Sequence, residues 1–231
     1  KYASSDSATD LTPDVACDGT GNWIAVWASD YNTGGIGTDY DILFSCSTTN
    51  GKTWGAAAAA NSNADTDSAS DMFPEIAKST GWNWVVVWHS SPSYGPDFDI
   101  LFAQTQNGGL SWYAPKLVND YGKSDTTDDT EPCTAGDGTG AMVTVWTTDG
   151  DPNWTIGKDV DTLLSYSKDD GRNWSNAQPL NLTATVDTAA DSYPDIAGDG
   201  KGTWLAVWYS TNNLGGTGSD CDIFVTRFKV P

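Results

Sequence analysis

Basic residues are scarce in this 231-residue chain, and several residue types on which common functions depend are rarer still. Eleven Lys and Arg stand against 31 Asp and Glu, which gives a formal net charge of −20. The sequence has two Arg, two Glu and one His. A surface this acidic repels phosphate backbones and anionic lipid headgroups, so we expect neither nucleic-acid binding nor membrane-surface binding.

Long apolar runs and a cysteine framework are also missing. The longest plain apolar stretch, residues 55–60, is far shorter than the ~20 residues that cross a bilayer. Four Cys do not form a disulfide scaffold in a chain of this length. Lys1 begins the chain and no signal peptide is visible, so we interpret it as a mature product. Three sequons, at Asn153, Asn173 and Asn181, weakly favour an extracellular or cell-surface location for a secreted protein.

The hydrophobic residues follow a repeat of about 60 residues. Its landmarks are a proline (Pro13, Pro74, Pro132 and Pro194), a tryptophan (Trp27, Trp88, Trp146 and Trp208) and an Asp-x-Asp segment (39–45, 97–103, 159–165 and 220–226). Successive prolines are 61, 58 and 62 residues apart, and so are successive tryptophans. Four copies in register at three places predict a repeat architecture.

Each repeat has the pattern of a run of β-strands. The segment "WIAVW" at 23–27 alternates bulky and small residues, and both of its faces are apolar, as in a sheet buried between two neighbours. No helical period is sustained. We therefore predict an all-β fold, a four-bladed β-propeller with four antiparallel strands in each ~60-residue blade.

The blades are predicted to form a single domain over residues 1–231. They cover about 11–60, 61–121, 122–184 and 185–231, and residues 1–5 are predicted to close the last blade as its fourth strand. That strand would leave no free sheet edge. The alternative is an arc of a larger ring, completed by a second copy of the chain.

Three polar turns carry a resemblance to a known family. "STTNGKTW" (47–54), "TQNGGLSW" (105–112) and "SKDDGRNW" (167–174) resemble the BNR or Asp-box repeats of sialidase-like propellers, with the pattern Ser-x-Asp-x-Gly-x-Thr-Trp. The matching or conservatively replaced residues are Ser47, Gly51, Trp54, Thr105, Asn107, Gly109, Trp112, Ser167, Asp169, Gly171 and Trp174. Thr49 stands where the pattern has Asp. The resemblance implies that the boxes are structural turns on the face opposite the binding cleft.

Aspartate pairs recur in register with the repeat. One Asp lies seven residues and another three residues before each proline, and a second pair opens each Asp-x-Asp segment. These sixteen residues are Asp6, Asp10, Asp39, Asp41, Asp67, Asp71, Asp97, Asp99, Asp125, Asp129, Asp159, Asp161, Asp187, Asp191, Asp220 and Asp222. Because antiparallel strands alternate in direction, we expect both kinds of pair on one face and the boxes on the other.

Two interpretations of these aspartates stay open. In the first, they cap turns by accepting hydrogen bonds from backbone N–H groups. In the second, pairs from adjacent loops bind Ca²⁺, a hard cation that takes about six to eight oxygen ligands. Crowded like charges are costly unless they are neutralised, and the chain has few Lys or Arg for that purpose.

The family resemblance also implies the catalytic groups to look for. Sialidases hold the substrate carboxylate with three Arg and use a Tyr–Glu pair and an Asp acid/base. Here the only Arg are Arg172, inside a box, and Arg227, so that clamp cannot be built. Another kind of glycosidase needs two carboxylates, which the aspartates would offer. The single His89 follows a strand end and is interpreted as a loop residue.

The loops between second and third strands differ most among the repeats. Aromatic residues in or beside them offer stacking surfaces for a sugar or a protein partner, unless they pack the rim: Tyr31, Tyr94, Trp154 and Tyr209. We predict a non-catalytic extracellular binding or assembly module, stabilised by Ca²⁺ under the second interpretation. The alternatives are a glycoside hydrolase that uses the aspartates, and a structural subunit of a surface layer, filament or virion.

Overall fold

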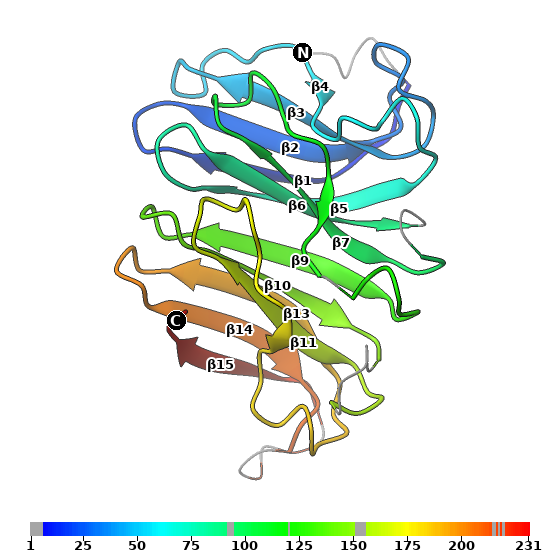
Figure 1. Cartoon of the computed structure of the whole chain (residues 1–231), viewed down its shortest axis with the longest axis vertical. Helices are drawn as coiled ribbons and strands as arrows, with labels where there is room; N and C mark the ends of the chain where they lie inside the picture. The colour runs from blue at the N-terminus through cyan, green and yellow to red at the C-terminus, as the bar shows by residue number, and fades with distance from the viewer. Residues whose placement is uncertain are drawn as a thin grey trace.

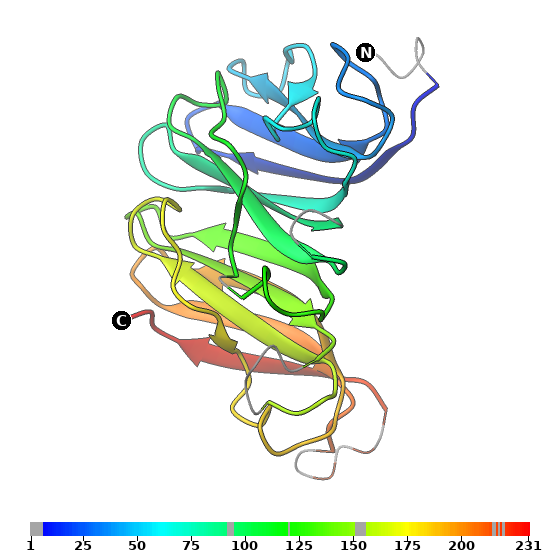
Figure 2. The same ribbon diagram turned by 45° about the vertical axis from the view of Figure 1, so that its right-hand side comes forward.

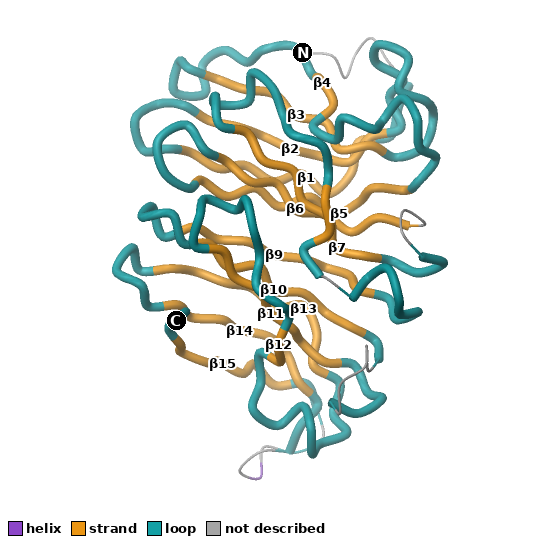
Figure 3. Tube along the Cα trace, viewed as in Figure 1, coloured by secondary structure: helices purple, strands orange, loops and turns teal. Residues whose placement is uncertain are grey.

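The computed structural model confirms the all-β prediction. It describes residues 7–91, 95–119, 121–150, 156–213, 216, 218 and 220–231. These residues form four antiparallel sheets and no α-helix (Figure 3). Accordingly, the described part of the chain has no helix long and apolar enough to cross a membrane.

Within every sheet the strands follow one another in chain order. The first sheet is β1 (Asp10–Cys17), β2 (Trp23–Ser29), β3 (Asp41–Ser47) and β4 (Ala58–Ala59). The second is β5 (Ser70–Lys78), β6 (Trp84–Ser91), β7 (Asp99–Thr105) and β8 (Lys116–Leu117). The third is β9 (Asp129–Gly136), β10 (Met142–Thr148), β11 (Asp161–Ser167) and β12 (Gln178–Pro179). The fourth is β13 (Asp191–Gly198), β14 (Trp204–Ser210) and β15 (Asp222–Phe228).

In the first, third and fourth sheets, the turn between the first and second strands is closed by an aspartate side chain. In the first sheet, Asp18 Oδ1 accepts hydrogen bonds from the backbone N–H groups of Thr20 (2.8 Å) and Asn22 (3.0 Å). Asp137 and Asp199 do the same in the third and fourth sheets. A short acceptor that bonds the backbone two and four residues later fixes the tight turn.

The box turns lie between the third and fourth strands. The third-position side chain accepts a hydrogen bond from the backbone N–H group four residues later, in Thr49 (2.9 Å), Asn107 (3.0 Å) and Asp169 (2.9 Å). A hydroxyl or an amide therefore makes the same closing bond as the Asp of the family pattern. The box tryptophans then reach back to the preceding sheet, where Trp112 packs edge-on against Phe44, with ring centroids 5.4 Å apart.

Each sheet has two apolar faces, because alternate residues of a strand point to opposite sides. We name them face A and face B. In the first sheet, face A carries Ile24, Val26 and Phe44, whereas face B carries Trp27 and Leu43. The same positions define the two faces of the other sheets.

Neighbouring sheets pack face A on face B. Face A of the first sheet, with Ile24, Val26, Ile42 and Phe44, forms one cluster with Trp84, Val86, Trp88 and Leu101 of the second. Val85, Val87, Ile100 and Phe102 of the second sheet pack on Met142, Trp146 and Leu163 of the third. Val143, Val145 and Leu164 of the third pack on Trp204, Ala206 and Trp208 of the fourth. One interface thus occurs three times.

The four sheets follow one another as an arc, with the first and the fourth at opposite ends (Figures 1 and 2). Face A of the fourth sheet is exposed at Leu205 (48%), Ile223 (76%) and Val225 (64%). Face B of the first sheet borders a hollow of about 680 Å³. The predicted closing strand, residues 1–5, lies outside the described residues, so closure of the ring stays a prediction.

The box tryptophans provide a matched test of this packing. Replacing Trp112 by Ala should lower the free energy of unfolding by about 2 kcal/mol or more, because the indole packs against Phe44 of the sheet before it. Trp54, the equivalent residue of the first sheet, is 40% exposed, and its replacement should cost clearly less. Urea unfolding of both variants measures the difference, and equal losses would contradict the face-A-on-face-B packing.

Candidate functional site

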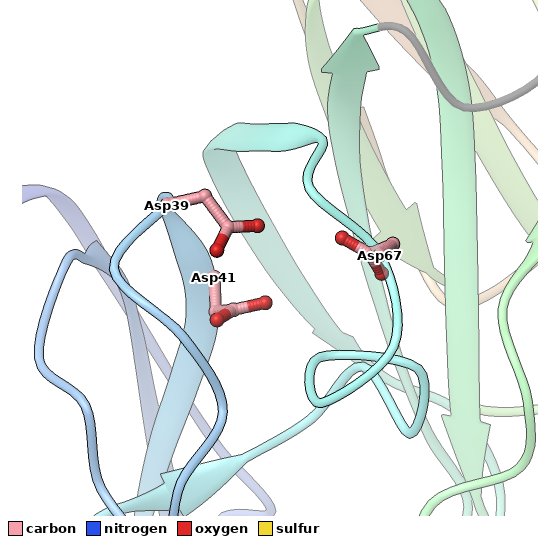
Figure 4. A group of neighbouring side chains, drawn as sticks. All are labelled: Asp39, Asp41 and Asp67. Carbon is pink, nitrogen blue, oxygen red and sulfur yellow. The ribbon is translucent and has the colours of Figure 1, made fainter.

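Three clusters of aspartates lie at the joints between neighbouring sheets. In the first, Asp39 and Asp41 come from the start of β3, and Asp67 comes from the loop that leads to β5 (Figure 4). One carboxylate oxygen from each of the three lies within 4.8 Å of the others. The second and third clusters repeat this arrangement with Asp97, Asp99 and Asp125, and with Asp159, Asp161 and Asp187.

In the first two clusters, an asparagine links the cluster to the next aspartate along the chain, and an equivalent asparagine bonds that aspartate at the third joint. Asn61 Nδ2 donates hydrogen bonds to Asp41 Oδ1 (2.8 Å) and to Asp71 Oδ2 (2.8 Å). Asn119 joins Asp99 to Asp129 in the same way, and Asn181 donates to Asp191. Asp41 and Asp71 therefore lie on one face, as the strand directions predict. Sequence reasoning missed these asparagines, although each stands ten residues before the linked aspartate.

A glycine two residues before the first aspartate makes room for its carboxylate. A Cβ atom on Gly37 would lie 2.6 Å from Asp39 Oδ1, and one on Gly157 would lie 2.5 Å from Asp159 Oδ1. Both glycines also have positive φ, 111° and 109°, which residues with a Cβ rarely adopt. The Gly-x-Asp-x-Asp order is thus required by the shape of the loop.

Burial and mutual repulsion shift the pKa of the innermost aspartates. Burial raises the pKa of Asp41 to about 7; the carboxylates of Asp39 and Asp67 add to this rise, and the hydrogen bond from Asn61 opposes it. Burial likewise raises the pKa of Asp99 to about 7 and of Asp161 to about 8, again with help from neighbouring carboxylates. A fully ionised cluster is therefore costly unless a proton or a cation offsets its charge.

Not every predicted aspartate joins a cluster of three. Asp71 and Asp129 lie behind the first two clusters and are connected to them through Asn61 and Asn119, and Asp191 accepts a hydrogen bond from Asn181. Asp10 accepts a hydrogen bond from the Ser29 hydroxyl (2.6 Å). Asp220 and Asp222 stand at the start of β15, where the described residues provide no third aspartate, and Asp6 lies outside the described residues.

A second group of side chains lies at the same ends of the first strands. The residue before each repeat proline has a positive φ, and it falls in a β-bulge where the pairing register shifts. These residues are Thr12 (45°), Phe73 (55°), Glu131 (55°) and Tyr193 (53°). Positive φ is unusual for β-branched and bulky residues, and bulges redirect side chains. We call the face that carries this group and the aspartate clusters the loop face.

The strained residues are held in place by the neighbouring sheet. The Tyr193 N–H donates to Thr147 Oγ1 (3.1 Å), and the Thr147 hydroxyl donates to Glu131 Oε2 (3.3 Å). Glu131 also accepts a hydrogen bond from the Tyr193 hydroxyl, which raises the pKa of that phenol. Tyr193 in turn stacks on Tyr209, with ring centroids 5.5 Å apart. An exposed tyrosine, a half-buried tyrosine and a carboxylate thus lie side by side.

The position of His89 differs from the sequence prediction. It is not a loop residue but a buried residue of β6, 6% exposed, whose ring lies 5.0 Å from those of Phe73 and Phe98. Its Nδ1 accepts the Glu131 N–H at 3.4 Å. Burial lowers the pKa of His89 to about 4, although the charge of Asp128 opposes the shift. The equivalent residues Ala28, Thr147 and Tyr209 also lie within the second strands of their sheets, so the strand continues past the tryptophan at which the sequence interpretation ended it.

Sequence reasoning also missed a titratable cluster on the first strands. The residue after each repeat proline is Asp14, Glu75, Cys133 or Asp195, and these side chains meet across neighbouring sheets. Asp14 Oδ2 accepts the Ile76 N–H (2.8 Å), and the Cys133 thiol donates to Asp195 Oδ1 (3.1 Å). Burial, then the charges of Asp14 and Asp195, raise the pKa of Glu75 to about 8. Their constant place after the proline was the available signal.

The two predicted aromatic ligands that the structure describes lie on different sheets. Tyr31 follows β2 in the first sheet and borders the hollow beside face B, whereas Tyr209 lies in β14 of the fourth sheet. Tyr94 and Trp154 lie outside the described residues. Tyr209 lies against Tyr193, one of the strained residues of the loop face.

No protein-family model and no curated protein sequence matches this chain. Several solved structures, however, are similar to this chain. A microbial sialidase, Hadza Hz136, has a TM-score of 0.59 at 17% identity and covers 94% of this chain and 44% of its own. The fold is that of a sialidase-like β-propeller.

Two further structures extend the comparison. An α-L-arabinanase from Penicillium chrysogenum, solved with arabinobiose, has a TM-score of 0.60 at 14% identity and covers 96% of this chain and 63% of its own. A Dyadobacter fermentans protein of unknown function has a TM-score of 0.64 at 14% identity, with 96% and 66% covered. This chain spans about half to two thirds of the length of these three structures. At such identities they show the fold alone.

The buried histidine gives a pH test of the loop face. A His whose pKa falls from 6.5 to about 4 on folding stabilises the protein above pH 6.5, and this contribution is lost as the pH falls toward 4. Wild type should lose up to about 1.4 kcal/mol per pH unit across that window from this group. His89→Asn, which keeps an acceptor for the Glu131 N–H, should lack that part of the loss. Urea unfolding between pH 7 and 4.5 measures it, and parallel curves would contradict the assignment.

Proposed function

We propose that this chain is a non-catalytic, extracellular glycan-binding module that uses the loop face as its binding surface. The observation that carries the proposal is the group of strained residues before the repeat prolines. Phe73 and Tyr193 are 40% and 59% exposed, and Glu131 lies beside Tyr193. Backbone strain of this kind persists only where the surrounding structure holds the residue in place, and such residues cluster at ligand-binding and active sites.

The chemistry of the group suits a sugar. An aromatic face packs against the C–H face of a pyranose or furanose, and a carboxylate accepts hydrogen bonds from hydroxyl groups. Stacking of Tyr193 on Tyr209 and the hydrogen bond to Glu131 fix the ring before a ligand arrives. A surface that is already ordered loses little entropy on binding. The similarity to an arabinanase solved with arabinobiose supports the same ligand class.

The aspartate clusters support binding better than hydrolysis. Asp41, Asp99 and Asp161 are at most 1% exposed, so they are out of reach of a polysaccharide. Arg172 belongs to a box turn, and Arg227 lies on β15, which leaves the described part of the chain without the three-Arg clamp of a sialidase. The non-catalytic assignment rests on these two points.

A glycoside hydrolase is the second candidate, and one observation favours it. The hydrogen bond between Tyr193 and Glu131 makes a Tyr–Glu pair of the type that the sialidase resemblance led us to look for. Hydrolysis would then use this pair and not the buried aspartates. Chromogenic arabinosides, sialosides and other glycosides, incubated with wild type and with Tyr193→Phe, distinguish the two candidates: turnover by wild type that Tyr193→Phe abolishes would replace binding by catalysis.

The binding proposal predicts which side chains matter. On a glycan array followed by titration calorimetry, Tyr193→Ala and Tyr209→Ala should each weaken binding about tenfold, which corresponds to about 1.4 kcal/mol. Tyr31→Ala removes a tyrosine at the opposite end of the molecule and should leave the affinity unchanged. Absence of binding to any glycan, or equal losses in all three variants, would contradict the proposal.

A further inference from the structure

The aspartate clusters hold more acceptor oxygens than the protein uses. Asp41 Oδ2, Asp99 Oδ2 and both carboxylate oxygens of Asp161 are buried and have no hydrogen-bond partner. The three side chains are 1%, 0% and 0% exposed, so bulk solvent does not reach these oxygens. A buried carboxylate oxygen without a partner is costly. The same cost is repeated at all three joints.

The capping interpretation accounts for part of each cluster. Asp67 Oδ1 accepts the Ala69 N–H (3.1 Å), and Asp125 Oδ2 accepts the Thr127 hydroxyl (2.5 Å). The remaining oxygens face one another across the joint (Figure 4). Besides those of Asp41, Asp99 and Asp161, the oxygens without a partner are Asp39 Oδ2, Asp97 Oδ1 and Oδ2, Asp125 Oδ1, Asp159 Oδ2 and Asp187 Oδ1. Caps therefore explain one oxygen of an aspartate and leave the other unexplained.

We propose that each of the three clusters binds one divalent cation, with Ca²⁺ as the ion that fits best. The donors are carboxylate oxygens, with no His or Cys among them, which favours a hard cation over Zn²⁺ or Cu²⁺. Ca²⁺ accepts irregular geometry and about six to eight oxygens, so carboxylates with added water molecules suffice. The ion would join the start of one sheet's third strand to the loop that begins the next sheet.

The capping and Ca²⁺-binding interpretations predict different changes in the melting temperature of an Asp→Asn variant. Asp161→Asn keeps the shape of the side chain and removes a buried charge. In EDTA the variant should melt at the same temperature as wild type or higher, because repulsion with Asp159 and Asp187 is relieved. In 1 mM Ca²⁺ it should melt lower than wild type, because one ion is lost. A cap alone predicts the same direction of change under both conditions.

The metal content of the protein gives the number of ions bound per chain. After dialysis against buffer containing Ca²⁺, elemental analysis of the full chain should give three ions per chain for wild type and two for Asp161→Asn. Asp222→Asn is the matched control, since it stands at the equivalent position of the fourth sheet, and it should leave three. Wild type without stoichiometric Ca²⁺, or without a change of melting temperature in EDTA, overturns the proposal. A cluster whose Asp→Asn variant leaves the count unchanged is excluded as a site.

An independent observation concerns the two ends of the arc. Leu205, Val207, Ile223 and Val225 occupy the face-A positions that Ile24, Val26, Ile42 and Phe44 occupy in the first sheet. The first-sheet residues are at most 9% exposed, whereas those of the fourth sheet are 37–76% exposed. At the other end, Trp54 and Leu43 border the hollow beside face B of the first sheet. Among the described residues, face A of the fourth sheet is therefore uncovered, and face B of the first sheet borders a hollow in which Trp54 is 40% exposed while Leu43 is buried.

We infer that face A of the fourth sheet docks on face B of the first sheet of a second copy of this chain. A second copy is the partner that fits, because each of the three internal joints covers a face A with a face B of this same repeat. In this contact Trp54 would meet Val225, as Trp112 meets Phe44 and Trp174 meets Phe102 inside the molecule. The association is head-to-tail, so each copy uses two different surfaces.

Complementary variants test this contact. Ile223→Asp disables face A and Trp54→Asp disables face B, so each variant alone should be monomeric in analytical ultracentrifugation at 150 mM NaCl. Wild type should associate with rising concentration, and an equimolar mixture of the variants should give dimers and nothing larger. Leu182→Asp, at a 98% exposed leucine on neither face, is the control and should associate like wild type.

Three results would overturn the inference. The first is wild type that stays monomeric up to 0.2 mM. The second is a mixture of the two variants that does not dimerise although both have native circular dichroism. The third is a monomer in which hydrogen exchange at β15 is as slow as at β7, because that result means that the chain covers its own face A.

Discussion

Each sheet of this protein has two apolar faces, and only another sheet can cover them. This constraint decides the arrangement of the molecule. The tryptophans of one sheet, such as Trp84 and Trp88, fill the space left by the smaller Ile24 and Val26 of the sheet before it. Because the same contact is repeated, the loops at each joint are brought to the same relative position, and the aspartates that they carry meet three times. The acidic clusters are thus a consequence of apolar packing.

The aspartate clusters at the joints and the residues before the repeat prolines use the backbone differently. At the joints, glycine with positive φ lets a carboxylate approach, as Gly37 does for Asp39. Before the repeat prolines, bulky residues such as Glu131 and Tyr193 take up positive φ themselves. The N–H group of each is satisfied by a side chain of the preceding sheet, His89 or Thr147. Strain in one sheet is therefore supported by the next.

The sequence predicted the features that repeat and missed those that depend on contact between sheets. Proline and tryptophan spacing was sufficient for the strands, and strand direction was sufficient to place Asp41 and Asp71 on one face. Asn61 was missed because an isolated Asn carries no signal until its two aspartates are seen together. His89 was assigned to a loop because its burial depends on Phe73 of β5 and on Phe98, which precedes β7, and these rings contact it only when the strands of the second sheet have paired. Ring closure by residues 1–5, which the repeat pattern predicts, stays a prediction because those residues lie outside the described part of the chain.

Packing of face A on face B creates the proposed cation sites at the joints. A crystal structure grown with Ca²⁺, with data collected where calcium scatters anomalously, tests it most directly. The account predicts three anomalous peaks, one among Asp39, Asp41 and Asp67 and one in each equivalent cluster. A map in which these carboxylates hold only protons and water, or in which Asp39 and Asp67 lie far apart, would contradict it.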